Sequence, residues 1–106
     1  HLLRVFNNLL SNAVQAVEEQ GAGTVRIQAE RAGQGCLVRV VDEGVGIAPE
    51  RLDRIFEPRF TTKSSGTGLG LSMAQMLVNH FGGLIEVASE QGVGTTFSVW
   101  LPTALE

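Results

Sequence analysis

The chain has 106 residues, 13 of them glycine, and its eight basic residues leave a formal net charge of −3. This length and a hydrophobic content of 43% favour one folded domain over a disordered chain. The acidic balance argues against nonspecific nucleic-acid binding, and no apolar run approaches the ~20 residues of a membrane span. A lone Cys36 excludes an internal disulfide and a multi-cysteine zinc site, and it favours a reducing, cytoplasmic setting.

The first half of the chain predicts one helix and two strands. Apolar residues recur every three or four positions over 2–19, which predicts an amphipathic helix. Alternating residues predict strands over 24–30 and 36–43, which we expect to form a hairpin. No signal peptide is visible. Because the helical pattern begins at the first residues, we expect the chain to be a piece of a longer protein.

The second half contains a long loop, a helix and two strands. Residues 44–66 are irregular, with one short helix expected at 49–55 because proline suits a first helical turn. A long helix is predicted from about 67 to 80, and strands over 84–90 and 95–101 form a second hairpin. This order predicts an α/β (α+β) two-layer sandwich with helices on one face of a largely antiparallel sheet. A loop of this length in a compact domain is typical of a functional segment or a disordered one.

Amide side chains share one face of the first predicted helix. Asn8 and Asn12 are one turn apart, and Gln15 continues the same face. An uncharged amide can bind a metal ion through its oxygen or a phosphate through its nitrogen. A solvated polar face is the alternative interpretation of this pattern.

The second predicted strand ends in a carboxylate. Asp42 shares the side of the apolar Val40, so we expect it to face the helices. Such a carboxylate is costly unless it accepts hydrogen bonds, for example from the exocyclic amine of a purine. Gly44 and Gly46 would let the backbone approach a flat ligand, and Ile47 could cover its face. An ordinary turn after a strand would also explain this segment.

The long loop enters the second long helix through Gly66-Thr67-Gly68-Leu69-Gly70-Leu71. Such a junction offers free backbone N–H groups and a positive helix end to an anion, so it could hold a polyphosphate without a lysine cluster. The glycine spacing excludes a P-loop and disfavours a dinucleotide fold, and a flexible hinge is the alternative. Thr95, at the start of the last predicted strand, could bind a ligand beside Asp42, although taken alone this segment is better explained as a hairpin turn followed by a β-prone threonine pair.

Taken together, these motifs resemble the ATP-binding catalytic domain of bacterial two-component sensor histidine kinases. The same superfamily includes gyrase, mismatch-repair proteins and a heat-shock chaperone. The family fold is a Bergerat-type sandwich of helices on a mixed sheet. The matching segments are Asn8-Leu9-Leu10-Ser11-Asn12-Ala13 (N box), Asp42 to Ile47 (G1 box), Ile55 to Lys63 (F box), Gly66 to Leu71 (G2 box) and the glycine-threonine turn near 94–95.

The resemblance implies a role for each segment. Asn12 would ligate the Mg²⁺ that bridges the ATP phosphates, and Asn8 would support metal and phosphates, so these two would be the catalytic residues. Asp42 would hold the adenine amine, with Gly46 and Thr95 close by, and residues 48–65 would form an ATP lid. The remaining nucleotide-binding residues would be Gln15, Gly44, Ile47, Phe56, Phe60, Thr61, Thr62, Lys63, Gly66, Thr67, Gly68, Leu69, Gly70 and Leu71.

Two positions depart from the family pattern. The family often has an aromatic residue where Arg59 stands, which affects how the lid would pack. It commonly has a basic residue where Gln15 stands, so one phosphate contact would be missing or supplied elsewhere.

The implied activity is transfer of the γ-phosphoryl group of Mg-ATP to a histidine on a separate dimerisation domain, for relay to a response regulator. The related ATPases have a water-activating glutamate where this chain has Asn8, so the helix offers no general base to water. A GHKL-type ATPase and a degenerate binding-only module are the alternatives.

The acceptor histidine is expected to lie outside this chain. The family's acceptor is followed by an acidic residue, and neither His1-Leu2 nor His80-Phe81 fits that pattern. We therefore expect the dimerisation hairpin, the sensor region and an N-terminal strand to be absent, and the isolated domain to be inactive as an autokinase. We expect a monomer that contacts neither nucleic acid nor membrane, from the cytoplasmic portion of a possibly membrane-bound sensor kinase.

Overall fold

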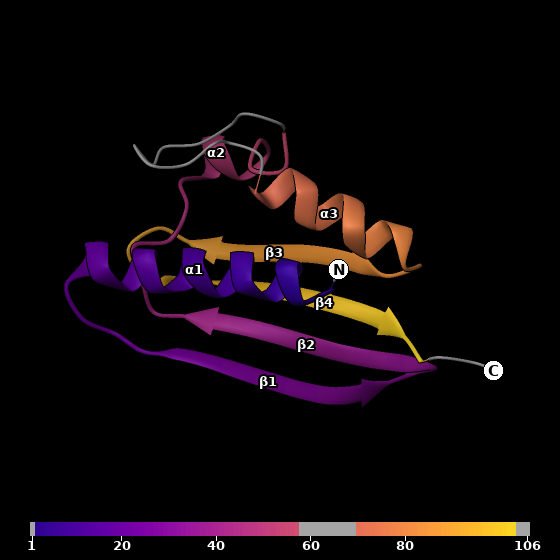
Figure 1. The fold of residues 1–106 in the computed structure, drawn as a ribbon. Helices are drawn as coiled ribbons and strands as arrows, with labels where there is room; N and C mark the ends of the chain where they lie inside the picture. Colours follow the sequence, from indigo (N-terminus) through magenta and orange to yellow (C-terminus); the bar gives the residue numbers. More distant parts are fainter. Residues whose placement is uncertain (1, 58–69, 104–106) are drawn as a thin grey trace.

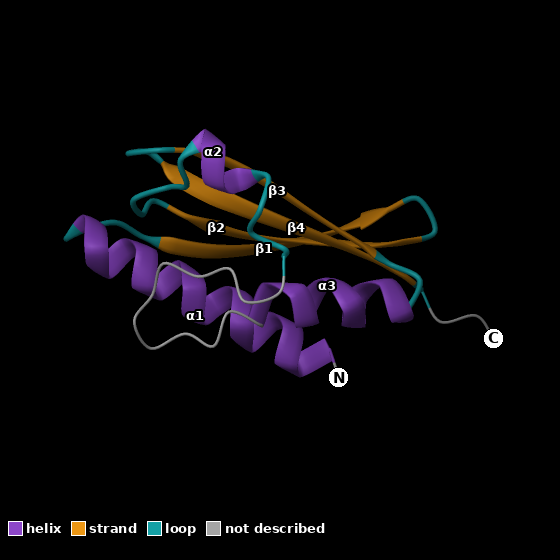
Figure 2. Ribbon diagram, turned by 90° about the horizontal axis from the view of Figure 1, so that it is seen from above, coloured by secondary structure: helices purple, strands orange, loops and turns teal. Residues whose placement is uncertain are grey.

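The computed structural model describes residues 2–57 and 70–103, which form a four-stranded sheet with its two long helices on one side (Figures 1 and 2). The elements in chain order are α1 (Leu2–Gln20), β1 (Val25–Ala32), β2 (Gly35–Asp42), α2 (Pro49–Leu52), α3 (Gly70–His80), β3 (Leu84–Glu90) and β4 (Gly94–Pro102). The two-layer arrangement expected from the sequence is therefore confirmed. None of the described helices is both long and apolar enough to cross a lipid bilayer.

The sheet has the strand order β1-β2-β4-β3, and each neighbouring pair is antiparallel. The mixed sheet of the family fold would include a parallel pair, and none occurs among the described strands. The last strand of the chain lies between β2 and β3, so it joins the two hairpins into one sheet. As a result, β2 and β3 both end at the edge where β4 begins (Figure 1).

The core lies between the helix-facing side of the sheet and the two long helices. Side chains alternate along each strand, so paired residues form rows across this side. Two of these rows are apolar: Ile27, Val40, Phe97 and Val87 form one, and Ala29, Val38, Val99 and Ile85 form the next. The helices cover the rows with buried side chains, namely Val5, Leu9 and Ala13 of α1 and Ala74 and Val78 of α3.

Most observed boundaries lie within two residues of those predicted, and the short helix differs most. The helix expected over 49–55 is regular only over Pro49–Leu52. The backbone then changes to bonds between residues three apart, with Arg54 N–H donating to the Arg51 carbonyl and Glu57 N–H to the Arg54 carbonyl. These turns follow a helix too short to be stable alone, and they accompany the burial of Ile55 in the core. The part of the second long helix expected at 67–69 lies outside the described residues.

Leu9→Ala tests the packing of α1 on the sheet. Leu9 is 0% exposed, so its truncation should lower the free energy of unfolding by about 3 kcal/mol through lost burial and a cavity. Urea denaturation followed by the fluorescence of the single tryptophan, Trp100, measures this. Leu3→Ala on the same helix, at a side chain 68% exposed, should cost less than about 0.5 kcal/mol. Equal losses for the two variants would contradict this packing.

Candidate functional site

One row on the helix-facing side of the sheet is polar. Asp42 of β2 lies opposite Thr95 of β4, and Thr95 lies opposite Ser89 of β3. Asp42 and Thr95 are each only 5% exposed, and Ser89 is half-buried. The next row inward holds Val40 and Phe97, so the hydroxyl and carboxylate groups form a polar strip beside an apolar floor.

The Asp42 side chain faces the helix layer, as the alternation of the strand predicted, and its surroundings hold it in place. One carboxylate oxygen, Oδ1, accepts a hydrogen bond of 2.9 Å from the Gly44 backbone N–H. This bond closes a short turn at the end of β2 and limits rotation of the carboxylate. The Glu43 N–H donates to the Thr24 carbonyl at 3.0 Å, which fastens the same turn to the start of β1. The carboxylate is therefore preorganised to accept hydrogen bonds.

The loop after Asp42 is fastened to the β3–β4 hairpin. The Ile47 N–H donates to Ser89 Oγ at 2.8 Å, and the Gly92 N–H donates to the Val45 carbonyl at 2.7 Å. Gly46 has a φ of 72°, a conformation that favours glycine, and a Cβ there would collide with the backbone of Glu90. Ile47 is half-buried and packs against the core cluster. The Gly44–Ile47 segment is thus held against the polar row.

Helix α1 carries the two asparagines along one edge of the same region. Asn12 Nδ2 donates to Asn8 Oδ1 at 3.4 Å, so the pair predicted to share a helix face also makes contact. The start of α3 lies against this pair, because a Cβ on Gly70 would collide with the Asn8 amide. The structure therefore brings Asn8 and Gly70 together, although 61 residues of chain separate them.

Two close contacts position α1 relative to both ends of this region. Asn8 adjoins Gly70, and two turns later Ala16 adjoins Gly44, where a Cβ would lie 2.5 Å from Ala16 backbone and side-chain carbons. The Val45 N–H also donates to the Ala16 carbonyl at 3.2 Å. Eight residues of α-helix span about 12 Å, so α1 separates the carboxylate end from the asparagine end by that length. An elongated ligand with a polar ring at one end and anionic groups at the other suits this spacing.

Gln15 lies between the two ends on the predicted amide face. Its Oε1 is buried and has no hydrogen-bond partner among the described residues. An unpaired buried acceptor costs about 1–3 kcal/mol, so a donor on a ligand or a water molecule would stabilise it.

The other predicted site residues divide into two groups. Phe56 is half-buried, and its ring meets the Phe97 ring edge-on with centroids 6.4 Å apart, so it anchors the segment after α2 on the core. Leu71 is half-buried near the start of α3 and also packs against the core cluster. The predicted residues Phe60, Thr61, Thr62, Lys63, Gly66, Thr67, Gly68 and Leu69, and with them part of the lid proposed at 48–65, lie outside the described residues.

Ser89 is a site residue that the sequence interpretation missed. Its hydroxyl lies 2.7 Å from Thr95 Oγ1. The predicted strands over 84–90 and 95–101 would have placed Glu90 opposite Thr95. The observed hairpin has a shorter loop over 91–93, which pairs Glu90 with Gly94 and brings Ser89 opposite Thr95.

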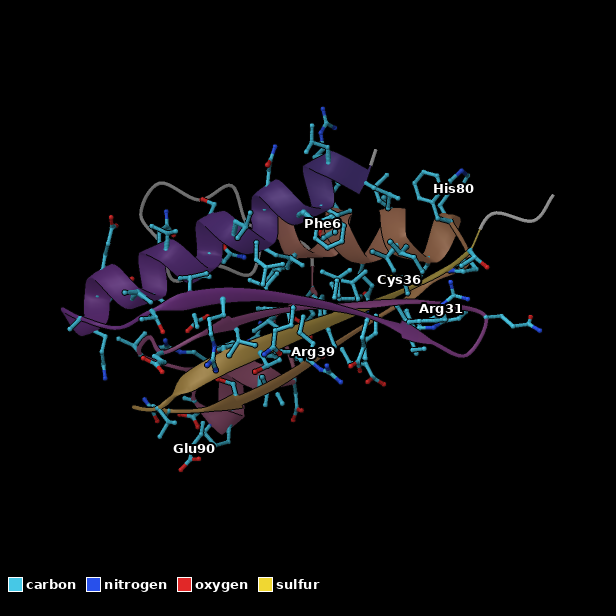
Figure 3. The ribbon with its side chains drawn as sticks, turned by 90° about the horizontal axis from the view of Figure 1, so that it is seen from below. Phe6, Arg31, Cys36, Arg39, His80 and Glu90 are labelled. Carbon is cyan, nitrogen blue, oxygen red and sulfur yellow. The ribbon has the colours of Figure 1, made fainter. Side chains whose placement is uncertain are left out.

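A surface cavity of about 340 Å³ lies at the other end of the sheet, lined by residues that include Arg31 and Cys36. Figure 3 shows these two residues far from Glu90, which directly follows Ser89 at the end of β3. The cavity is therefore separate from the polar row, and none of the predicted site residues lines it.

Comparison with known proteins identifies the family. The model of the histidine kinase-, DNA gyrase B-, and HSP90-like ATPase family matches residues 1–105. The chain belongs to this family. The resemblance inferred from the sequence motifs is thereby confirmed.

Individual relatives of the ATPase family agree with this result. The chain is 46% identical over 101 residues to the sensor histidine kinase ZraS of Escherichia coli K12, covering 95% of this chain and 21% of that protein. It therefore spans about a fifth of the length of that relative. A structure of the mycobacterial sensor histidine kinase MprB matches with a TM-score of 0.80 at 28% identity, covering 93% of this chain and 70% of that one. The catalytic domain of histidine kinase ThkA matches with a TM-score of 0.78 at 34% identity, covering 92% and 63%.

The residues present fit a nucleotide of the kind that this ATPase family binds. The buried Asp42 acceptor suits a base that carries an amine. The asparagine amides offer neutral oxygens, and no group of three or more His, Cys, Asp or Glu side chains among the described residues could hold a metal ion. In nucleotide sites Mg²⁺ usually takes part of its ligands from the phosphates.

Gly44→Ala tests the close approach of α1 to the Asp42 turn. The added methyl would collide with the backbone of a helix that cannot move alone, so the free energy of unfolding should fall by about 1–3 kcal/mol. Gly70→Ala is the matched control, because its methyl meets the end of the Asn8 side chain, which can rotate away.

The control should therefore cost less than about 1 kcal/mol while shifting the side-chain amide resonances of Asn8. Urea denaturation and ¹⁵N–¹H NMR spectra measure the two effects. The contacts described here would be wrong if both variants lost the same stability.

Proposed function

We propose that this domain binds Mg-ATP and presents its γ-phosphoryl group to a histidine on a separate dimerisation domain. The single observation that supports this most is the buried polar row, in which a preorganised carboxylate lies beside an apolar floor. A carboxylate in that position selects a ring that carries an amine donor. Adenine offers such a donor and a flat apolar face, whereas guanine offers a carbonyl oxygen at the equivalent position.

The phosphate end of the nucleotide would lie at the N-terminal half of α1. Asn12 would ligate Mg²⁺ that bridges the phosphates, and Asn8 would support both. The glycine-rich entry to α3 would add backbone N–H groups and the positive end of the helix dipole. When bound, the metal would supply charge neutralisation on the phosphates, while these residues orient the chain of phosphates.

Phosphoryl transfer fits the site better than hydrolysis. The α1 face that meets Gly70 presents the amides of Asn8 and Asn12, and an amide cannot remove a proton from water at neutral pH. The related ATPases have a glutamate where this chain has Asn8. The proposed role is therefore to hold and orient ATP for an acceptor histidine supplied by another domain, with relay to a response regulator.

The setting that goes with this role is the cytoplasmic part of a sensor kinase, and its direct partner is the dimerisation and phosphoacceptor domain of the same parent protein. The relatives named above include sensor histidine kinases, which supports this assignment. A GHKL-type ATPase and a binding-only module are the alternatives, and the second experiment below distinguishes them.

Asp42→Asn tests the adenine end of the site. Replacing a charged acceptor should weaken ATP binding by about 10- to 100-fold, because a hydrogen bond to a charged group contributes about 1.5–3 kcal/mol. Isothermal titration with ATP, with and without Mg²⁺, measures this. The same substitution should weaken the binding of purine riboside triphosphate much less than that of ATP, because purine riboside triphosphate lacks the exocyclic amine.

Glu86→Gln is the matched control, since it removes a carboxylate charge from an exposed position on the opposite face of β3 and should leave ATP affinity unchanged. If the unmodified chain fails to bind ATP, the nucleotide proposal is wrong. The adenine assignment is wrong if Asp42→Asn weakens both triphosphates equally.

Asn12→Ala tests phosphoryl transfer. The domain is mixed with a purified dimerisation domain carrying an acceptor histidine and with ATP labelled at the γ-phosphate. Label should reach the histidine with the unmodified domain and fall at least tenfold with Asn12→Ala, since the proposed metal ligand is lost. Asn79→Ala, at an exposed position near the end of α3, is the control and should transfer normally.

The same assay separates the alternatives. Rapid release of inorganic phosphate without the acceptor domain would favour the ATPase. Binding of ATP with neither release nor transfer would favour the binding-only module.

A further inference from the structure

Ser89 occupies a central place in the polar row, although none of the motifs of the proposed function includes it. It is the last helix-facing residue of β3, and it lies directly opposite Thr95, which lies directly opposite Asp42. Its hydroxyl lies within hydrogen-bond distance of three groups from two different segments. A serine that only filled space in a strand would not need such a set of partners.

The hydrogen bonds of Ser89 leave little freedom to its neighbours. A hydroxyl has one proton to donate and two lone pairs that accept. The Ile47 N–H donates to Ser89 Oγ at 2.8 Å, which uses one lone pair. The Ser89 proton can go to the Gly94 carbonyl at 3.0 Å, and the second lone pair then accepts the proton of Thr95 at 2.7 Å.

This arrangement determines what the Thr95 hydroxyl offers to a ligand. While its proton points to Ser89, its lone pairs are available beside Asp42. If Ser89 instead donates to Thr95, the Thr95 proton becomes available as a donor. The pair can therefore present either an acceptor or a donor at one fixed position. A purine ring nitrogen needs a donor and the neighbouring amine needs an acceptor, and Thr95 can meet either need directly or through a bound water.

The second consequence concerns the loop after Asp42. Ser89 Oγ is the acceptor for the Ile47 N–H, at the end of the Gly44–Ile47 segment. Removing the hydroxyl would leave a half-buried N–H and the Thr95 hydroxyl each without this partner. The Gly44–Ile47 segment and the Thr95 side chain would then both lose their fixed positions.

We propose that Ser89 is a positioning residue for the adenine end of the nucleotide site, which holds the Thr95 hydroxyl beside Asp42 and clamps the Ile47 backbone to β3. This inference rests on the proposed binding of ATP. It assigns to Ser89 no contact with the ligand, so its effect on affinity passes through Thr95 and Ile47.

The test is a double-mutant cycle on ATP affinity, measured by isothermal titration. Ser89→Ala and Thr95→Val should each weaken ATP binding about tenfold. The double variant should bind ATP no more than about threefold more weakly than either single variant, because Ser89 acts through the Thr95 hydroxyl that Thr95→Val removes. Ser89→Thr keeps the hydroxyl and should stay within about threefold of the unmodified chain. A residue with a merely structural role would show neither the coupling nor this rescue.

Two matched controls lie on the opposite side of the sheet. Ser98→Ala and Thr96→Val are the same substitutions at positions that face away from the helices, and both should leave ATP affinity unchanged. Thermal unfolding of each variant reports its stability. Ser89→Cys, which keeps nearly the same volume but bonds weakly through sulfur, replaces Ser89→Ala if that variant does not fold, and it should lose affinity likewise.

The outcomes separate this inference from the proposed function. If the unmodified chain binds ATP and Ser89→Ala binds it equally well, the role of Ser89 is wrong while ATP binding stands. If the losses of Ser89→Ala and Thr95→Val multiply in the double variant, Ser89 does not act through Thr95 and the inference is overturned. Failure of the unmodified chain to bind ATP refutes the proposed function itself.

Discussion

The Asp42 carboxylate is buried at the end of a sheet whose next two helix-facing rows are apolar, and this burial constrains much of the site. A charged group so placed is unfavourable unless hydrogen bonds compensate for the water that it loses. The turn that follows it supplies one such bond from Gly44, and Thr95 lies opposite it across the strand pair. The Gly44–Ile47 segment, helix α1 and the β3–β4 hairpin are therefore arranged around one buried carboxylate, as is usual in a binding site.

Helix α1 connects the two ends of the site because it contacts a glycine at each. A side chain at Gly44 would collide with the backbone of the helix, so that position needs glycine, whereas a side chain at Gly70 would displace only the end of the Asn8 side chain. The hydrophobic side of the same helix is buried on the sheet through Val5, Leu9 and Ala13. Packing in the core thus determines where the polar face lies, and the distance between the carboxylate and the asparagines follows from helix geometry rather than from flexible loops.

Hydroxyl groups complete the polar row in a way that charges could not. A second carboxylate beside Asp42 would repel it, and a lysine would pair with it and occupy the acceptor. The neighbouring Thr95 and Ser89 are neutral, and either can be the donor in the hydrogen bond that they share. The row therefore carries one charged side chain, Asp42, beside two neutral hydroxyl groups.

The sequence predicted those features that depend on neighbours along the chain. Alternation in β2 placed Asp42 on the helix side, helical spacing placed Asn8 and Asn12 on one face, and the motif order identified the family. The sequence could not predict by local pattern that β4 enters between β2 and β3, because strand order is decided by contacts between residues far apart. That insertion creates the row of Asp42, Thr95 and Ser89.

Periodicity and motif spacing are local properties, so the elements, the faces of the polar residues and the family can be derived from the order of amino acids alone. Which of these faces meet depends on the folded chain. The contact of Gly70 with Asn8 and the hydrogen bond of Ser89 to Ile47 join segments more than 40 residues apart. Such contacts depend on how the whole chain packs. The same elements could be arranged in several ways, and burial of the shared core selects one of them.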